Sequence, residues 1–341
     1  MKKHLYSLIR VLPILMLIGC TGQGGHMFMK PSKEKPMTVR IDYRIFSGDG
    51  RTAGLEDIVI ASGNADVIFI GESHGDPAAH FLEEEIFREI YCNSRIQEDA
   101  RPFILSLEMF ERDVQPVVDE YLADLISERH FLNSARPWPN YLRDYRPILE
   151  FAKENRIQII AANAPGRYAN RVSRLGPLAL NDLPPSARNW LPPLPYAEAS
   201  QAYREKFKNF WDENEKKRAE MKEKGHKMPP SHAVNPKEQF QFDNLLAAQS
   251  LWDASMAYAI SLGIKENPRV QILHVNGQFH SAQGLGIPEH LLRYCPDVRI
   301  LTITILPVEG FPDFQAEASG AGDFVILTNP KLLRPVMGMG D

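Results

Sequence analysis

Cysteine is scarce in this chain, with 3 residues among 341. One of them, Cys20, lies close to the beginning, so a disulfide in the body of the protein would have to join Cys92 and Cys295. The sequence alone does not place the Cβ atoms of these two residues within bridging distance. A single disulfide and two buried free thiols therefore both stay open as interpretations.

The chain also lacks an excess of basic residues. It contains 39 Lys and Arg against 43 Asp and Glu, which gives a formal charge of −4. The first 19 residues hold three of the basic residues and none of the acidic ones, so the remainder has 36 against 43 and a formal charge of −7. Because proteins that bind phosphate backbones need a basic surface, this balance argues against nucleic acid as a partner.

The apolar run near the beginning is too short to cross a bilayer. Val11–Ile18 is accompanied by three basic residues, which is the length and charge pattern of a secretory signal. The segment Leu17-Ile18-Gly19-Cys20 resembles the bacterial lipobox, in which cleavage before the cysteine leaves its thiol carrying a lipid. We therefore expect a lipoprotein signal peptide over residues 1–19 and a lipid on Cys20. The alternative is an ordinary signal with an incidental cysteine.

A tether and one large domain are expected after the signal. Residues 20–38 are rich in Gly, Lys and Pro without periodicity, so we interpret them as a tether between the lipid and the domain. Thr21, rather than an aspartate, follows the cysteine, which favours the outer membrane of the bacterial cell envelope. The domain is placed at residues 39–335, a length that suits one large domain or one α/β domain with an inserted subdomain.

Ionisable side chains follow one apolar run that has the length of a buried strand. The run Val67–Ile70 leads directly into Gly71-Glu72-Ser73-His74-Gly75. In an open parallel sheet the carboxyl ends of the strands border the ligand crevice. Glu72 and His74 are two residues apart, so in extended chain their side chains leave from the same side. The alternative is a loop in which both residues only cap the helix that begins near Pro77.

Strand and helix patterns alternate along much of the chain. Further strand signals are Phe103–Leu107, Ile157–Ala161, Val270–Val275, Arg299–Leu306 and Asp323–Leu327. Helical patterns lie at Ala78–Asn93, Val114–Ile126 and Tyr141–Asn155. This alternation predicts an α/β fold with a mainly parallel sheet and helices on both faces.

The middle of the chain predicts an α-helical cap, inserted into the α/β domain at about residues 177–262. A proline-rich connection leads into a helical stretch, and a second helical pattern at Gln239–Leu262 follows with no strand between them. Aromatic residues recur near the first helix at spacings of seven, four and three, which predicts one stripe: Tyr196, Tyr203, Phe207, Phe210 and Trp211. Such a stripe is more often a packing surface than a cofactor site.

A second histidine also follows a predicted strand. His280 comes just past one strand end, as His74 does, and Glu108 directly follows another, so Glu72, His74, Glu108 and His280 are expected to converge. Two imidazoles and two carboxylates in one crevice suit a divalent metal ion or an acid/base pair. The alternative is that each residue caps its own helix or turn.

Together these motifs resemble the ChaN-like haem-binding lipoproteins, a family in the wider group that includes the Tiki proteases and the erythromycin esterases. The resemblance spans roughly Val39–Pro307. It rests on Gly71–His74, Ser106–Phe110, Trp138 with Tyr141 and Tyr145, Asn163–Pro165, Gln249–Asp253 with Met256 and Ala257, and His274–His280. The combination is specific, whereas no single segment would be.

The resemblance implies an α/β core with a helical cap, a lipid anchor, and haem held between two paired subunits. In the family, a tyrosine meets the haem iron and a histidine of the other subunit lies near the porphyrin. A phenolate is a hard oxygen donor that stabilises ferric iron. The short motifs do not identify the tyrosine. The candidates are Tyr196 and Tyr203, followed by Tyr168, and the candidate histidines are His226 and His232 of the cap loop.

Two functions of different classes follow. The first is a haem-binding homodimer of the cell envelope, anchored to the membrane by its lipid, that captures or stores haem for iron acquisition. The second is a hydrolase that uses Glu72, His74, Glu108 and His280 on a metal ion or on water, as the esterase and protease relatives suggest. We favour binding, because the aromatic stripe, the lipid anchor and the resemblance agree, although the strand-end cluster is more ionisable than a haem pocket needs.

Overall fold

The computed structural model describes residues 42–97, 99–223 and 242–334. The predicted signal peptide, the lipobox with Cys20 and the tether lie outside these ranges, as do His226 and His232. Within the described ranges, Cys92 is exposed, Cys295 is half-buried, and both are free thiols. None of the described helices combines the length and the apolarity that crossing a membrane requires.

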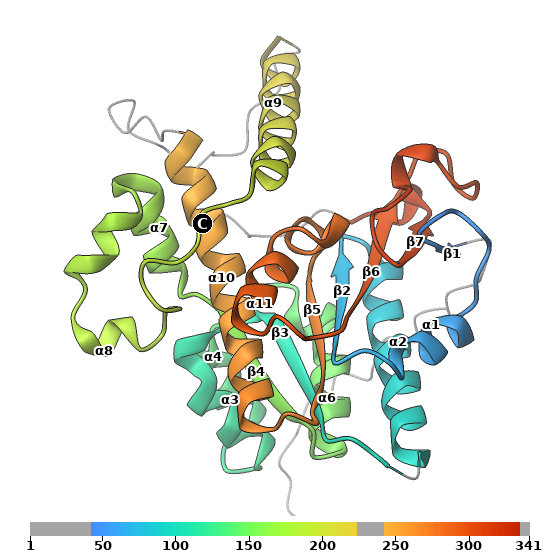
Figure 1. The fold of residues 1–341 in the computed structure, drawn as a ribbon, viewed down its shortest axis with the longest axis horizontal. Coiled ribbons are helices and arrows are strands. Elements are labelled where there is room, and N and C mark those ends of the chain that lie inside the picture. Colours follow the sequence, from blue (N-terminus) through green and yellow to red (C-terminus); the bar gives the residue numbers. More distant parts are fainter. Residues whose placement is uncertain (1–41, 98, 224–241, 335–341) are drawn as a thin grey trace, which may run out of the picture. The chain divides into compact units, whose positions relative to one another are not determined.

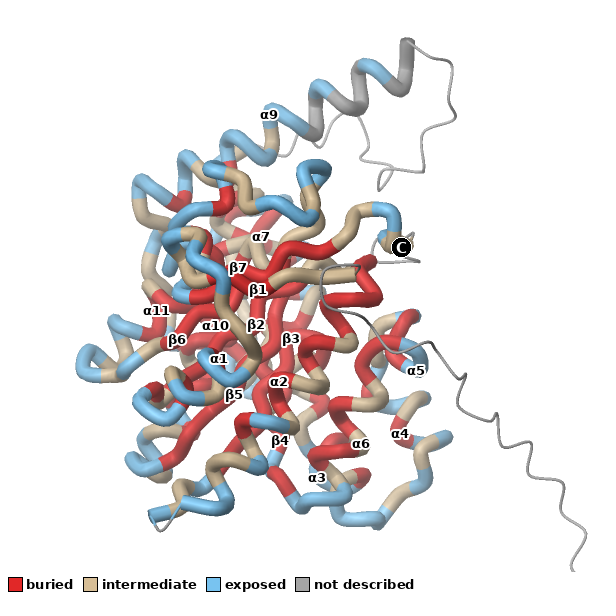
Figure 2. Tube along the Cα trace, turned by 90° about the vertical axis from the view of Figure 1, so that its right-hand side faces the viewer, coloured by how far each residue is buried: buried red, intermediate tan, exposed pale blue. Residues whose placement is uncertain are grey.

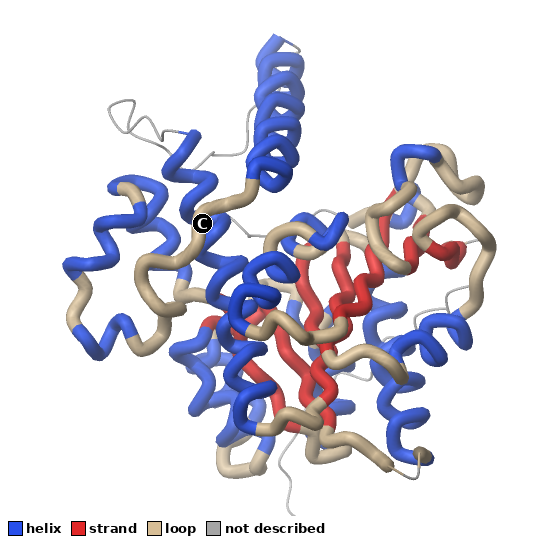
Figure 3. The backbone as a smooth tube through the Cα atoms, in the orientation of Figure 1, coloured by secondary structure: helices blue, strands red, loops and turns tan. Residues whose placement is uncertain are grey.

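One mixed sheet forms the centre of the described domain (Figure 3). Its strand order is β1-β7-β6-β2-β5-β3-β4, with β1 antiparallel to β7 and every other neighbouring pair parallel. The strands are β1 Tyr43–Ser47, β2 Val67–Glu72, β3 Phe103–Glu111, β4 Gln158–Asn163, β5 Gln271–Gly277, β6 Ile300–Pro307 and β7 Phe324–Thr328. The predicted α/β fold with a mainly parallel sheet is confirmed.

Helices cover both faces of this sheet (Figure 1). The α-helices are α1 Leu55–Ser62, α2 Pro77–Ile96, α3 Gln115–Leu122, α4 Glu128–Ala135, α5 Tyr141–Asp144, α6 Arg146–Glu154, α7 Gly166–Leu175, α8 Pro185–Arg188, α9 Gln201–Glu223, α10 Phe242–Glu266 and α11 Ile287–Tyr294. Short 3-10 helices are η1 Arg112–Val114, η2 Pro177–Asp182, η3 Gln278–His280, η4 Ala282–Gly284, η5 Ala316–Ala318 and η6 Pro330–Leu332.

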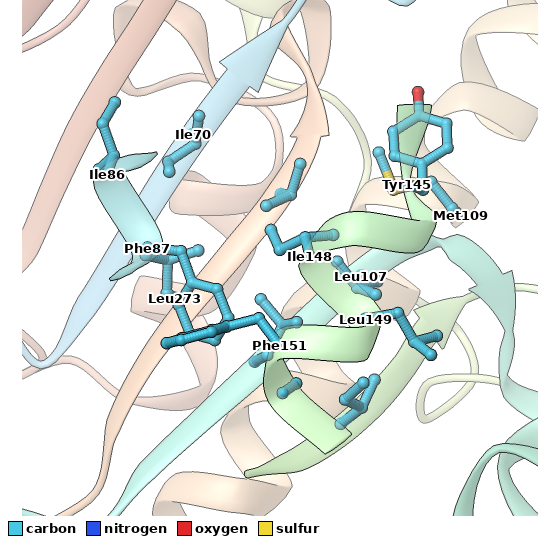
Figure 4. Packing of buried hydrophobic residues seen from close by; sticks show 14 of the residues in the cluster. Ile70, Ile86, Phe87, Leu107, Met109, Tyr145, Ile148, Leu149, Phe151 and Leu273 are labelled. Carbon is cyan, nitrogen blue, oxygen red and sulfur yellow. The ribbon is translucent and has the colours of Figure 1, made fainter. Parts of the chain in front are cut away.

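The central strand β2 is continuously apolar because both of its faces are buried. Ile68 and Ile70 face one apolar cluster, in which Figure 4 shows Ile70 near Ile86 of α2. Val67 and Phe69 face a second cluster, which α10 and α11 build on the other side of the sheet. Successive side chains of a strand point to opposite faces, so a strand covered on both faces buries all of its apolar residues. Each such side chain contributes roughly 1.5–3 kcal/mol.

Two local features differ from the sequence expectation. The predicted helix Tyr141–Asn155 is divided into α5 and α6, because Pro147 lacks the N–H that a continuous helix needs and instead occupies the first turn of α6. Strand β3 continues to Glu111, so Glu108 lies within the strand instead of after it. The short elements β1 and α1 were not predicted.

The segment predicted as a cap, residues 177–262, contains η2, α8, α9 and most of α10. The later part of α10 packs Met256, Ala257 and Ile260 onto the sheet, so this helix also belongs to the layer that covers it. In α9, Tyr203 and Phe207 are buried and most other described side chains are half-buried or exposed (Figure 2). Both aromatic residues pack in an apolar cluster with Leu246. Tyr196 lies in the loop before α9, so it does not continue a helical stripe.

Asp66 ties together the amino ends of several strands. Its Oδ1 accepts hydrogen bonds from Arg101 at 2.6 Å and from Arg299 at 2.8 Å, and these arginines lie within two residues of the starts of β3 and β6. Arg101 also donates to the carbonyl of Val270, which precedes β5. The hydrogen bonds from Arg299, helped by Arg101 and opposed by partial burial, lower the pKa of Asp66 to about 2.

This shift predicts an acid-sensitive contribution to stability. A carboxyl whose pKa falls on folding stabilises the fold above its unfolded pKa of about 3.9, and this contribution disappears as the pH falls through about 2. We expect Asp66→Asn to lower the free energy of unfolding in urea at about pH 5, and the difference from wild type to shrink towards about pH 2. Asp297→Asn, on an exposed carboxylate nearby, is the control. An Asp66→Asn deficit of equal size at both pH values would contradict the assignment.

Candidate functional site

The candidate site lies at the carboxyl ends of three neighbouring strands. In the sheet, β5 lies between β2 and β3, and the register pairs Glu72 of β2 with Gly277 of β5. Glu108 of β3 reaches across to the same level, where its Oε2 accepts a hydrogen bond of 2.6 Å from the N–H of Gly277. Both carboxylates are buried. The strand order therefore gathers Glu72 and Glu108 around Gly277.

His280 is held between two carboxylates in the turn that follows β5. Its Nδ1 lies 2.5 Å from Oδ1 of Asp253 on α10, and its Nε2 lies 3.5 Å from Oε1 of Glu108. His280, Asp253 and Glu108 are all buried. Burial opposes the charged imidazolium, but Glu108 and Asp253 outweigh it, so the pKa of His280 is raised.

His74 is the more accessible of the two predicted histidines, with 26 % of its side chain exposed. Its Nδ1 lies 2.6 Å from Oε1 of Glu72, and the hydroxyl of Tyr145 donates to the same oxygen at 2.8 Å. Burial opposes protonation of His74, but the Glu72 charge, its hydrogen bond and the Glu108 charge outweigh it and raise the pKa to about 9. The rings of His74 and Trp138 also lie nearly perpendicular to each other, at 4.9 Å between centroids.

Cε1 and Nε2 of His74 lie against Gly277. A Cβ at residue 277 would come within 2.8 Å of both Cε1 and Nε2 of His74, and within 3.7 Å of Oε2 of Glu108. A glycine is therefore required for His74 and Glu108 to approach β5 this closely. Because His74 and Glu108 both lie against Gly277, the Glu72–His74 pair lies next to the Glu108–His280 pair.

The four residues predicted from the strand ends are thus brought to one edge of the sheet. The alternative in which Glu72 and His74 cap a helix does not hold, because Asp76 is the N-cap of α2 and accepts a hydrogen bond from the N–H of Ala78. Among the described residues, the group of three potential ligands with donor atoms within 4.8 Å of one another is Glu72, His80 and Glu83. The predicted quartet is not grouped that tightly.

The candidate haem tyrosines have three different environments. Tyr203 is 1 % exposed, and burial together with the charge of Asp253 raises its pKa well above the ordinary value. Tyr168 is 8 % exposed, and the guanidinium of Arg167 lies 4.5 Å from its ring centroid. Tyr196 is half-buried, and its hydroxyl donates to the carbonyl of Ala247 at 2.7 Å. Tyr168 and Tyr196 pack in one apolar cluster, whereas Tyr203 packs in another.

Sequence reasoning assigned no role to four other members of the site: Asp253, Tyr145, His80 and Glu83. Asp253 lies between apolar residues of a helix that packs on the sheet, and it is completely buried. His80 and Glu83 lie on the buried side of α2. A charged residue on the apolar face of a predicted helix is the signal that would have found them, because such residues are rarely buried without a partner.

The comparisons with known proteins agree with this picture. The model of a protein family described as haem-binding uptake, Tiki superfamily, ChaN, matches residues 59–291. A solved structure described as cofacial haem binding to ChaN of Campylobacter jejuni is similar to this chain, with a TM-score of 0.61 and 18% identity. The similarity covers 86% of this chain and 100% of the other. At this level of identity it shows a shared fold.

Two further similarities were found. An erythromycin esterase mutant, EreC in its open conformation, has a TM-score of 0.40 and 11% identity, with 85% of this chain and 83% of the other covered. Protein RETICULATA-RELATED 5, chloroplastic, of Arabidopsis thaliana is 23% identical over 271 residues, which is 77% of this chain. The chain spans only 34% of the length of that curated relative.

Proposed function

This chain belongs to the haem-binding ChaN family of the Tiki superfamily, and from that premise we propose that it is a lipid-anchored envelope protein that binds haem for iron acquisition. The family match supports haem as the ligand. The cofacial haem binding described for the Campylobacter jejuni protein, whose fold this chain shares, supports two subunits that hold their haems face to face. The lipobox-like segment before Cys20 supports the anchor.

Tyr196 is the tyrosine that best fits a ligand to ferric haem. The observation that carries this assignment is its half-buried position in a loop, with a neutral hydrogen bond to the backbone carbonyl of Ala247. Giving up such a bond costs about 0.5–1.5 kcal/mol. Burial raises the pKa of Tyr196, so the phenol keeps its proton until ferric iron displaces it. Tyr203 does not fit, because its hydroxyl is buried beside Asp253.

The predicted cap also offers apolar side chains for the porphyrin and an arginine for a propionate. Haem is a broad apolar plate with two propionates, and the exposed apolar side chains of Leu178 and Phe210 lie in this segment. Arg204 forms an ion pair with Asp243, and both side chains are well exposed. Exposed ion pairs are worth only about 0–1 kcal/mol, so Arg204 can exchange Asp243 for a propionate at little cost.

Pairing of two subunits follows from the size of the ligand. A single cap leaves one face of the porphyrin in water, and a second cap would cover it. Each Å² of apolar surface removed from water favours association by ~25 cal/mol. Haem bound between subunits therefore stabilises the dimer by mass action, so dimerisation depends on the concentration of haem.

We expect Tyr196→Phe to remove the charge-transfer absorption of tyrosinate-bound ferric haem while the fold persists, because phenylalanine keeps the ring and lacks the oxygen. Tyr203→Phe is the matched control and should keep the wild-type spectrum. Hemin titration followed by absorption, with sedimentation velocity to follow dimerisation, checks both. An unchanged spectrum in Tyr196→Phe refutes the ligand assignment, and a wild type without saturable hemin binding refutes the function.

The anchor is tested separately. In bacterial cells, mass spectrometry of the membrane fraction should find a mature chain that begins at a lipid-modified Cys20, and Cys20→Ala should leave the chain unprocessed. A mature protein in the aqueous fraction with an unmodified Cys20 would exclude the anchor and would leave haem binding untouched.

The geometry at the strand ends favours a second candidate function, which is hydrolysis by acid/base chemistry, with or without a divalent metal. A carboxylate orients each of two histidines: Asp253 lies 2.5 Å from His280, and Glu72 lies 2.6 Å from His74. Carboxylate–imidazole pairs of this kind activate water or nucleophiles in unrelated hydrolases. Glu108 lies between the two pairs and is placed to receive a proton.

If the protein is a hydrolase, Glu108→Gln and His280→Ala should each abolish hydrolysis of ester or peptide substrates and should leave the hemin spectrum unchanged. Rates on a panel of chromogenic esters and peptides measure the first effect, and hemin titration measures the second. Absence of hydrolysis in the wild type across the panel would eliminate the hydrolase and would assign the strand-end residues a structural role.

A further inference from the structure

A separate cluster of ionisable groups lies on the α2 side of Glu72. Glu72 comes from the end of β2, and His80 and Glu83 come from the first half of α2. Their exposed fractions are 1%, 8% and 1%, so all three are shielded from solvent. Each residue has one donor atom that lies within 4.8 Å of the donor atoms of the other two.

Two carboxylate oxygens in this cluster lack hydrogen-bond partners among the described residues. They are Oε2 of Glu72 and Oε1 of Glu83. The other oxygen of Glu72 is already occupied by His74 and Tyr145. Buried polar atoms are almost always hydrogen-bonded. A cation bound by both carboxylates would satisfy these two oxygens.

The orientation of His80 points to the same conclusion. Its Nε2 lies 3.1 Å from the carbonyl oxygen of His74, and a carbonyl can only accept, so Nε2 carries a proton. Nδ1 faces Oε2 of Glu83, which is 3.4 Å away. Burial opposes a charged ring, but Glu72 and Glu83 outweigh it and raise the pKa of His80 to about 10, so without a metal a proton occupies Nδ1, the nitrogen that the ion would take. Histidines that bind metals commonly donate their other N–H to a backbone carbonyl, as His80 does here.

We propose that Glu72, His80 and Glu83 bind a divalent transition-metal ion of the Mn²⁺ or Zn²⁺ class. Two carboxylates and a neutral imidazole carry two negative charges, which a divalent ion balances. The imidazole disfavours Mg²⁺ and Ca²⁺, which take oxygen ligands, and the absence of a thiolate disfavours softer ions. Donors bound at about 2.1 Å to one ion lie within about 4.2 Å of each other, so small side-chain rotations close the site.

The ion would hold the accessible histidine in place. Glu72 would bind the metal through Oε2 while its Oε1 keeps the contact with His74, and His80 would remain fixed to the His74 carbonyl. Asp144 lies 3.7 Å from Nε2 of His80 and is itself paired with Arg143. The site is built from groups other than Tyr196, so it does not depend on haem binding.

The experiment uses the full chain without haem, stripped of metal by a chelator and titrated calorimetrically with Mn²⁺ or Zn²⁺ alone. We expect one ion per chain. Glu83→Gln should weaken the affinity by at least about tenfold, because it removes one of three ligands and keeps the shape of the side chain. Glu89→Gln, on the exposed side of the same helix, is the matched control. Glu108→Gln, in the strand-end group, should also bind like wild type.

A measurement on the wild type keeps the test decisive if Glu83→Gln does not fold. Electron spin echo spectroscopy of bound Mn²⁺ should detect the nitrogen of one imidazole, whereas a site built from His74, His280 and Glu108 would show two. The proposal is overturned if two imidazoles bind, if Glu108→Gln loses the ion while Glu83→Gln keeps it, or if neither ion binds. In the last case His80 itself supplies the positive charge as an imidazolium.

Discussion

The arrangement of this protein depends on charge balance in a place that water does not reach. Glu72, Glu108 and Asp253 are buried at or beside one edge of the sheet, where a single unpaired carboxylate would cost several kcal/mol. Each therefore has a partner: His74 and Tyr145 for Glu72, the N–H of Gly277 for Glu108, and His280 for Asp253. Burial opposes the ionisation of Glu72, yet the neighbouring imidazoles and hydrogen bonds lower its pKa below the ordinary value. The network is stable only when strands, turn and helices come together.

The backbone is shaped to let these groups approach. A Cβ on Gly71 would lie 2.9 Å from the Cα of Gln278, so the turn that carries His280 can rest on β2 only because residue 71 has no side chain. Gly277 plays the same part for His74 on the neighbouring strand. Two glycines on adjacent strands thus allow the backbones and the imidazoles to pack together, and the apolar strands hold them in register.

Much of this could be predicted from the sequence, for identifiable reasons. A strand covered on both faces must be a continuous apolar run, so β2, β5 and β6 were recognisable, and the polar residues at the strand ends followed from parallel topology. Asp253 and His80 were missed because each sits alone in a helical pattern, where spacing gives no hint of a partner far away in the chain. The aromatic stripe grouped Tyr196 with Tyr203 by spacing, but α9 begins at Gln201, so only Tyr203 follows the helical period.

The proposed haem ligand and the strand-end network use separate residues, and α9 is the element that connects them. Tyr196 lies in the loop that leads into this helix. Within the helix, Lys206 donates to the carbonyls of Phe279 and Ala282, both at 2.9 Å, on either side of His280. Burial lowers the pKa of Lys206 to about 8, which is the cost of placing an ammonium group there. The position of α9 and the position of His280 are therefore fixed by the same contacts, and neither can shift without changing the hydrogen bonds of the other.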